Sequence, residues 1–162
     1  MIELSDEAAM CKLGGNIASV AEIGDVICLS GPLGAGKTVF ARAFVRALTN
    51  SDENVPSPTF TLMQYYDGGP IPIFHYDLYR VESEADIQEL GFDDAVANGV
   101  LLIEWPERVS SEIFTNRLGI QIDCFPADQP DMRRVQFEPS DVWRDRLQQV
   151  LNAVTGEFDV TT

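Results

Sequence analysis

Residues 31 to 38 read Gly-Pro-Leu-Gly-Ala-Gly-Lys-Thr and match the P-loop pattern G-x-x-x-x-G-K-[ST]. The apolar run 26–29 precedes this loop, and the run 39–48 repeats its large apolar residues at helical spacing. The pattern requires this order of strand, glycine loop and helix. Glycines let backbone N–H groups curl around an anion, and the N-terminus of the following helix adds partial positive charge. The stretch therefore predicts a binding site for nucleotide phosphates.

The residues of this loop have separate expected roles. Lys37 is expected to reach the β- and γ-phosphates, and the hydroxyl of Thr38 is expected to bind Mg²⁺. A glycine-rich turn that merely caps a helix is the competing interpretation, and the strand and helix on either side disfavour it. The residues expected to surround the nucleotide are Gly31, Leu33, Gly34, Ala35, Gly36, Lys37, Thr38 and Val39.

A carboxylate at the end of a second buried strand is the expected partner of the P-loop metal. The apolar run 100–103 is followed by Glu104, where many P-loop proteins carry Asp. Trp105 comes next, so the acidic neighbour that often activates water in P-loop ATPases is missing. The sequence therefore predicts that Glu104 binds the metal and that nucleotide hydrolysis is slow. A surface carboxylate at a strand end is the alternative.

The composition predicts one domain over residues 1–162, because 162 residues with 45% hydrophobic content can bury one core. The longest apolar runs are too short to span a bilayer, and residues 1–7 are acidic where a signal peptide would be basic. We therefore expect a cytoplasmic protein that does not bind membranes. The three cysteines are widely spaced, which favours buried thiols over a disulfide framework or a zinc site.

The charge balance is strongly acidic, with 26 acidic and 11 basic residues and a formal net charge of −15. The chain has two lysines, Lys12 and Lys37, and one of them is assigned to the nucleotide. Binding to a phosphate backbone requires clustered basic residues, so we expect no direct DNA binding. If the protein acts on RNA, a more basic partner holds that RNA. A surface that serves only solubility explains the acidity equally well.

Two further segments combine reactive side chains with loop or strand-end positions. Thr59, in the loop Ser-Pro-Thr-Phe-Thr at 57–61, stands where a switch segment would sense the γ-phosphate, although a simple β-turn is the alternative. Asp77 closes an apolar strand and can order a water or the metal shell, or can cap a turn. His75 is the single histidine of the chain, and its aromatic surroundings favour a packed core residue.

The rest of the pattern predicts a three-layer, P-loop NTPase-like α/β fold with a mostly parallel central sheet that antiparallel hairpin strands extend. Residues 1–24 are expected to form an N-terminal helical region, and residues 155–162 a frayed tail. The other expected elements are a hairpin over 60–66 and 71–76, one or two short helices within 82–98, a second hairpin over 118–125 and 133–137, and a helix over 141–154.

In combination, five motifs give the chain a family resemblance from about residue 4 to about residue 137: Gly-Pro-Leu-Gly-Ala-Gly-Lys-Thr, Ser-Pro-Thr-Phe-Thr-Leu, His-Tyr-Asp-Leu-Tyr-Arg, Glu-Leu-Gly-Phe and Leu-Ile-Glu-Trp-Pro-Glu. The chain resembles the TsaE (YjeE-type) ATPases of bacterial tRNA threonylcarbamoyladenosine synthesis. The resemblance implies a subunit that binds ATP and Mg²⁺ and joins the TsaB and TsaD proteins. Its hydrolysis of ATP then supports modification of N6 of adenosine 37, and tRNA is reached through the partners.

The same resemblance implies roles for individual residues. Lys37 and Thr38 are nucleotide and metal residues, Thr59 lies in a switch-I-like loop, Asp77 is required for hydrolysis and Glu104 is the second metal ligand. Catalytic roles are therefore expected for Lys37, Thr59 and Asp77. The resemblance is weakest after residue 125, and it leaves open whether Arg133 or Arg134 reaches the nucleotide.

Three other functions compete with an ATPase subunit. A small-molecule P-loop kinase would need a lid with several arginines, and the one adjacent pair, Arg133-Arg134, falls in an expected strand. A GTPase would need a lysine after the P-loop for guanine recognition, and the chain has none after Lys37. A binding-only scaffold would keep its partner function when Lys37 or Asp77 is replaced by alanine.

Overall fold

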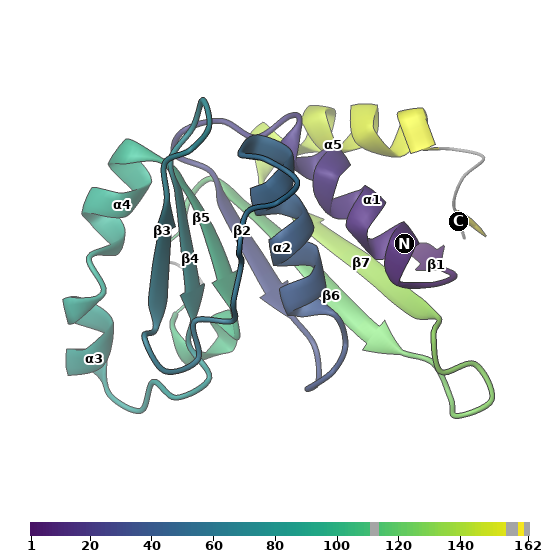
Figure 1. Cartoon of the computed structure of the whole chain (residues 1–162), viewed down its shortest axis with the longest axis horizontal. Helices are drawn as coiled ribbons and strands as arrows, with labels where there is room; N and C mark the ends of the chain where they lie inside the picture. The colour runs from purple at the N-terminus through teal and green to yellow at the C-terminus, as the bar shows by residue number, and fades with distance from the viewer. Residues whose placement is uncertain (111–113, 155–158, 161–162) are drawn as a thin grey trace.

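The computed structural model describes residues 1–110, 114–154 and 159–160, which form one eight-stranded sheet flanked by helices (Figure 1). The strand order is β3-β4-β5-β2-β6-β7-β1-β8. The strands are β1 (Ile2–Leu4), β2 (Val26–Ser30), β3 (Met63–Tyr66), β4 (Ile73–Asp77), β5 (Val100–Glu104), β6 (Arg117–Cys124), β7 (Arg133–Pro139) and β8 (Asp159–Val160). The helices are α1 (Glu7–Ala18), α2 (Lys37–Leu48), α3 (Glu84–Glu89), α4 (Phe92–Asn98), the 3₁₀ turn η1 (Pro106–Arg108) and α5 (Asp141–Val154).

The four central strands, β4, β5, β2 and β6, run parallel, whereas every pairing outside them is antiparallel. Strand β3 extends the sheet through a hairpin with β4, and β7 extends it through a hairpin with β6. This arrangement confirms the predicted fold class. Because parallel strands place their carboxyl ends at one edge, the loop after β2 and the last residues of β4 and β5 come together there.

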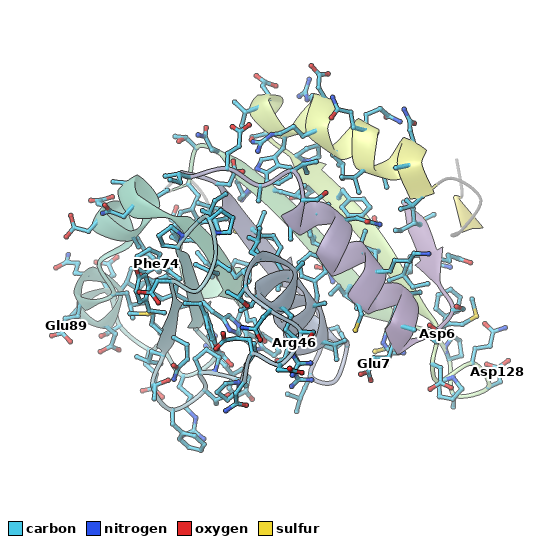
Figure 2. The ribbon with its side chains drawn as sticks, turned by 45° about the horizontal axis from the view of Figure 1, so that its top comes forward. Asp6, Glu7, Arg46, Phe74, Glu89 and Asp128 are labelled. Carbon is cyan, nitrogen blue, oxygen red and sulfur yellow. The ribbon has the colours of Figure 1, made fainter. Side chains whose placement is uncertain are left out.

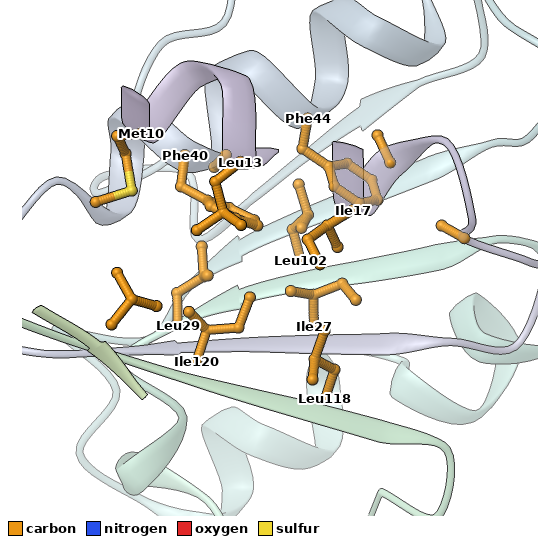
Figure 3. Close-up of a cluster of buried hydrophobic side chains, with 14 of the residues drawn as sticks. Met10, Leu13, Ile17, Ile27, Leu29, Phe40, Phe44, Leu102, Leu118 and Ile120 are labelled. Carbon is orange, nitrogen blue, oxygen red and sulfur yellow. The ribbon is translucent and has the colours of Figure 1, made fainter. Parts of the chain in front are cut away.

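Side chains alternate between the two faces of the sheet and define the layers. Ile27, Leu29 and Leu102 pack under α1 and α2 (Figure 3), in a cluster that also includes the apolar face of α5. Leu101 and Ile103 point the other way and pack with α4. Strand β5 is buried along its whole length, as expected for a parallel strand covered on both faces. The predicted three-layer arrangement is therefore confirmed.

Most predicted elements have the expected bounds, but the first hairpin strand is shorter than predicted. The sequence predicts a strand from Phe60, whereas β3 begins at Met63. Leu62 has a left-handed backbone (φ 63°), and its N–H donates to the carbonyl of Pro58 at 2.7 Å. A left-handed residue cannot continue an extended strand, so residues 60–62 form a turn instead.

Two short strands lie near the ends of the chain, at Ile2–Leu4 and Asp159–Val160. Strand β1 was not predicted, because three residues are too few for an alternating pattern to stand out. It pairs with β7 on one side and with β8 on the other. Within the tail predicted for 155–162, Asp159–Val160 form β8 and pair with β1. Residues 155–158 and 161–162 lie outside the described part of the chain.

The cysteines are only partly as predicted. Cys28 is buried on β2, whereas Cys11 and Cys124 are exposed and all three are free thiols. Cys11 lies on the side of α1 that faces away from the core, opposite to Met10 and Leu13.

The surface and the helices agree with the acidic, polar character of the sequence. Among the helices of the described residues, none has the length and apolar character that a membrane span requires. Figure 2 shows acidic side chains such as Asp6, Glu7 and Glu89 at the periphery of the ribbon.

Candidate nucleotide-binding site

The glycine loop leaves β2 through a backbone that only glycine adopts easily. Gly31 has φ 138°, and a Cβ atom there would lie 2.2 Å from the carbonyl oxygen of Ile122 on β6. Gly36, with φ 109°, is the N-cap of α2, and no side chain caps this helix. The first N–H groups of a helix have no intrahelical partner. The start of α2 therefore presents uncapped donors and the positive end of the helix dipole to an anion.

Lys37 lies in this loop with its ammonium group already engaged. The side chain is buried, and Nζ donates to the carbonyl oxygens of Gly31 at 2.6 Å and Pro32 at 2.9 Å. Nζ also lies 3.9 Å from the centre of the Trp105 ring, a cation–π distance. Burial lowers the pKa of Lys37, while the Glu104 carboxylate acts in the opposite direction. The ammonium group thus sits beside the loop in a low-dielectric setting where its charge acts strongly.

Polar side chains of strands β4 and β5 lie beside the glycine loop and the start of α2. Asp77 and Glu104 are direct partners in the parallel register, and His75 is paired with Leu102 two residues earlier. Because side chains alternate along a strand, Asp77, Glu104 and His75 all point to the α2 side of the sheet. The hydroxyl of Thr38 donates to Glu104, with distances of 3.0 Å to Oε2 and 3.2 Å to Oε1. His75 Nε2 lies 2.8 Å from Oε1 of the same carboxylate.

The carboxylate of Asp77 connects the end of β4 to the loop before β3. Its Oδ2 accepts hydrogen bonds from Ser57 Oγ at 3.2 Å and Thr59 Oγ1 at 3.1 Å. The other oxygen, Oδ1, accepts from the backbone N–H of Tyr79 at 3.0 Å. Asp77 is only 4% exposed. Asp77 therefore caps a local turn, which is one of the two interpretations that the sequence left open, and it also accepts hydrogen bonds from the hydroxyl groups of the Thr59 loop.

These side chains surround one cleft of about 330 Å³ above the carboxyl edge of the sheet. Gly31 and Ala35 are the predicted site residues that do not line it. Gly31 turns the chain out of β2, and Ala35 borders a second depression on the other flank of the loop, together with Met10 and Arg133. The cleft is lined by Leu33, Gly34, Gly36, Lys37, Thr38, Val39, Ser57, Thr59, Asp77, Tyr79, Arg80, Glu104 and Trp105.

Sequence reasoning missed His75 as a member of this group. It predicted a packed core residue, and the side chain is indeed fully buried, but its Nε2 is hydrogen-bonded to Glu104. The signal was present in the alternation of β4, because His75 stands two residues before Asp77 and so shares its face. Tyr79 and Arg80, which also line the cleft, follow Asp77 in the same motif.

The two adjacent arginines on β7, Arg133 and Arg134, make different contacts. Arg133 donates from Nε to the carbonyl oxygen of Ala35 at 2.9 Å. Arg134 points to the other face of the strand, where Nη2 lies 2.9 Å from the carboxylate of Glu3. Arg133 therefore contacts the glycine loop itself, and Arg134 belongs to the pairing of β7 with β1.

The parallel core, the glycine loop between β2 and α2, and the carboxylate on the adjacent β5 define an α/β protein of the P-loop NTPase-like class. A family model described as "Threonylcarbamoyl adenosine biosynthesis protein TsaE" matches residues 4–134. The chain therefore belongs to the TsaE family.

Individual relatives agree with this assignment. A tRNA threonylcarbamoyladenosine biosynthesis protein TsaE from Rickettsia felis is 41% identical over 107 residues, which cover 66% of this chain and 63% of the relative. The protein of the same name from Bacillus subtilis is 41% identical over 106 residues, or 65% of each chain. The aligned segments thus span somewhat less than two thirds of these relatives. The crystal structure of Bacillus subtilis YdiB has a TM-score of 0.73 and 26% identity, covering 97% of both chains.

Proposed function

We propose that this protein binds ATP with Mg²⁺ in the cleft and hydrolyses it slowly, as a cytoplasmic subunit in the biosynthesis of threonylcarbamoyladenosine in tRNA. The names of its relatives support the pathway. The resemblance noted above supports TsaB and TsaD as partners and N6 of adenosine 37 as the modified position. The contact of Thr38 with Glu104, at the start of the uncapped helix α2, is the observation that carries the nucleotide part of the proposal.

The phosphates are expected to lie over the start of α2. The uncapped N–H groups there and the ammonium of Lys37 supply the positive charge that a triphosphate needs. Lys37 Nζ donates to the carbonyl oxygens of Gly31 and Pro32. A phosphate oxygen is a stronger, charged acceptor for this group than a carbonyl oxygen. Binding would therefore redirect Lys37 from the loop backbone toward the nucleotide.

The donor set fits a magnesium ion that the nucleotide brings with it. Thr38 and Glu104 offer hard oxygen ligands side by side. Among the described residues, no cluster of three or more His, Cys, Asp or Glu side chains could hold a metal ion alone. Mg²⁺ in nucleotide sites is typically held by one or two protein ligands, phosphates and water. When bound, it neutralises charge on the phosphate oxygens during transfer.

Asp77 is the best-placed group to orient an attacking water. Its carboxylate borders the cleft and already accepts hydrogen bonds from Ser57 and Thr59. A γ-phosphate would compete for these hydroxyl groups, so the loop of residues 57–59 can report whether ATP is bound. Trp105 occupies the position after Glu104 where a second acidic residue would assist the water. The lack of this second acidic residue supports the proposal that intrinsic hydrolysis is slow.

The surface charge agrees with indirect access to tRNA. A net charge of −15 repels a phosphate backbone, and a phosphate-binding surface requires clustered lysines and arginines. A basic partner is therefore expected to hold the RNA. A small-molecule kinase would need several arginines around the transferred phosphate. Among the described residues, Arg80 is the one arginine that lines the cleft, so the structure gives this alternative little support. A screen that detected phosphate transfer from ATP to a nucleoside or sugar would favour it.

Calorimetry with ATP, in Mg²⁺ and in EDTA, tests the nucleotide part. We expect magnesium-dependent binding that Lys37→Ala weakens about tenfold or more. Lys12→Ala removes the other lysine of the chain, on α1, and is expected to leave the affinity unchanged. ATP turnover is then measured with and without TsaB and TsaD. Absence of magnesium-dependent binding by folded protein would refute the site, and unchanged turnover without co-elution would refute the partners.

A further inference from the structure

His75 is a fully buried histidine that touches the proposed metal ligand from behind. Its side chain lies on β4, and Nε2 is 2.8 Å from Oε1 of Glu104. The residue does not border the cleft, which is lined by Asp77 from the same strand. His75 therefore cannot meet a nucleotide directly, and any effect it has on the site must pass through Glu104.

The surroundings of the ring decide which nitrogen carries the proton. Nδ1 is buried and has no hydrogen-bond partner among the described residues. A buried N–H without an acceptor is costly, whereas a bare ring nitrogen has no hydrogen to satisfy. A proton on Nε2 is therefore favoured over a proton on Nδ1. His75 then donates this N–H to the Glu104 carboxylate.

Glu104 needs such a contact more than an aspartate would. Its side chain has one more methylene, and hence one more rotatable bond, than the Asp usual at this position. Both of its oxygens lie within 3.2 Å of the Thr38 hydroxyl, and Oε1 is also held by His75. Thr38 is itself expected to be a metal ligand, whereas His75 lies outside the cleft and would hold Glu104 without contacting the metal.

We infer that His75 is a positioning residue that fixes the Glu104 carboxylate for magnesium. This inference rests on the proposed function. It assigns His75 to the support of a metal ligand, a place where loss of the supporting hydrogen bond typically lowers metal affinity by about 10- to 100-fold. Nucleotide binding in the absence of magnesium does not use Glu104 as a ligand and should not depend on His75.

The test compares three replacements at this position. The amide N–H of Gln reaches about as far as Nε2 of histidine, so His75→Gln keeps the donor. His75→Leu removes the donor, and His75→Asn keeps an amide that is too short to reach Glu104. The affinity for ADP is measured in Mg²⁺ and in EDTA, and the ratio of the two is the readout. We expect His75→Leu and His75→Asn to lower this ratio about tenfold, and His75→Gln to remain within about threefold of the wild type.

A general loss of packing would not give this result. Tyr76→Phe is the matched control, since Tyr76 is the next residue of β4 and donates to the Leu90 carbonyl oxygen on the opposite face. It should lower the melting temperature and leave the ratio unchanged. If His75→Leu does not fold, the comparison of Asn with Gln decides. If magnesium does not raise the affinity of the wild type for ADP, the proposed function is refuted. If magnesium raises it in the wild type and equally in every folded His75 variant, the role of His75 is refuted.

Discussion

Arg133 of β7 contacts Ala35 of the glycine loop through a 2.9 Å hydrogen bond, which its Nε donates to the Ala35 carbonyl oxygen. Nη2 lies 3.4 Å from the carbonyl oxygen of Gly34, and Nη1 donates to the backbone of Pro130 at 2.6 Å. In a trans peptide group the C=O and N–H point in opposite directions. With the Ala35 carbonyl fixed toward Arg133, the N–H of Gly36 is turned away from it. The guanidinium therefore fixes the orientation of the peptide group between Ala35 and Gly36.

Replacement of this arginine should weaken ATP binding without direct loss of a phosphate contact. Arg133→Met removes the charge-assisted hydrogen bonds, each worth about 1.5–3 kcal/mol, and part of that loss should appear as a roughly 5- to 10-fold higher Kd by calorimetry. Arg134→Met is the control, because Arg134 pairs with Glu3 on the other face. Wild-type affinity in Arg133→Met would show that the loop keeps its shape unaided.

The site divides into parts that local sequence predicts and parts that it does not. The glycine loop and Glu104 were predictable because each follows directly on an apolar run that reads as a buried strand. The contact of His75 with Glu104 joins residues 29 positions apart. It depends on β4 lying beside β5 in one particular register, which no local pattern encodes. The contact of Arg133 with Ala35 depends in the same way on the sheet order.

Local backbone geometry explains the smaller differences. Phe60 to Leu62 read as the start of a strand because their side chains are apolar or β-branched, but the left-handed Leu62 ends any extended run there. The short β1 was missed because its stability comes from pairing with β7 and β8, not from its own three residues.

Asp77 should be needed for hydrolysis more than for binding. Asp77→Asn keeps the size of the side chain and a carbonyl oxygen that can accept from the N–H of Tyr79, but it removes the charge that would orient and deprotonate a water. We expect phosphate release at saturating ATP, with partners present, to fall about 100-fold or more. The Kd for ATP should change less than about threefold.

Ser57→Ala separates the charge of Asp77 from its hydrogen bonds. It removes one of the hydroxyl groups that donate to Oδ2 and leaves the carboxylate in place. Its effect on phosphate release should be much smaller than that of Asp77→Asn. The hydrolytic role is wrong if Asp77→Asn binds ATP poorly yet hydrolyses the bound nucleotide at the wild-type rate.

The three thiols should differ in reactivity as their burial differs. Burial raises the pKa of Cys28 to about 12. The pKa of Cys11 is also raised, mainly by partial burial and to a smaller extent by the negative charge of Glu7. Iodoacetamide at about pH 8.5 should label Cys11 and Cys124 in the folded protein, and all three thiols after denaturation. In Cys28→Ala the folded stoichiometry should be unchanged and the denatured one lower by one. Rapid labelling of Cys28 in the folded state would contradict the burial of β2.

The same shift predicts how stability depends on pH. The unfolded thiol loses its proton near its ordinary pKa of about 8.5, and the folded Cys28 only near 12. The contribution of the buried Cys28 thiol to the free energy of unfolding is therefore fully present below about pH 8.5 and is lost as the pH rises toward 12. Urea unfolding at pH 8 and at pH 10.5 should show a fall in the free energy of unfolding that is smaller in Cys28→Ala.

Two adjacent glycines in α1 should respond to alanine in opposite directions. A Cβ atom at Gly14 would lie 2.8 Å from the carbonyl oxygen of Phe40 and 3.1 Å from Cβ of Ala43, so Gly14→Ala must push α1 away from α2. We expect it to cost about 1–3 kcal/mol of unfolding free energy. At Gly15 the nearest such atom is Cβ of Ala47 at 3.9 Å, an ordinary contact. Gly15→Ala should therefore stabilise the protein by up to about 1 kcal/mol, through higher helix propensity. Urea denaturation of both variants measures the difference, and destabilisation of equal size would mean that close packing of α1 on α2 is not what requires Gly14.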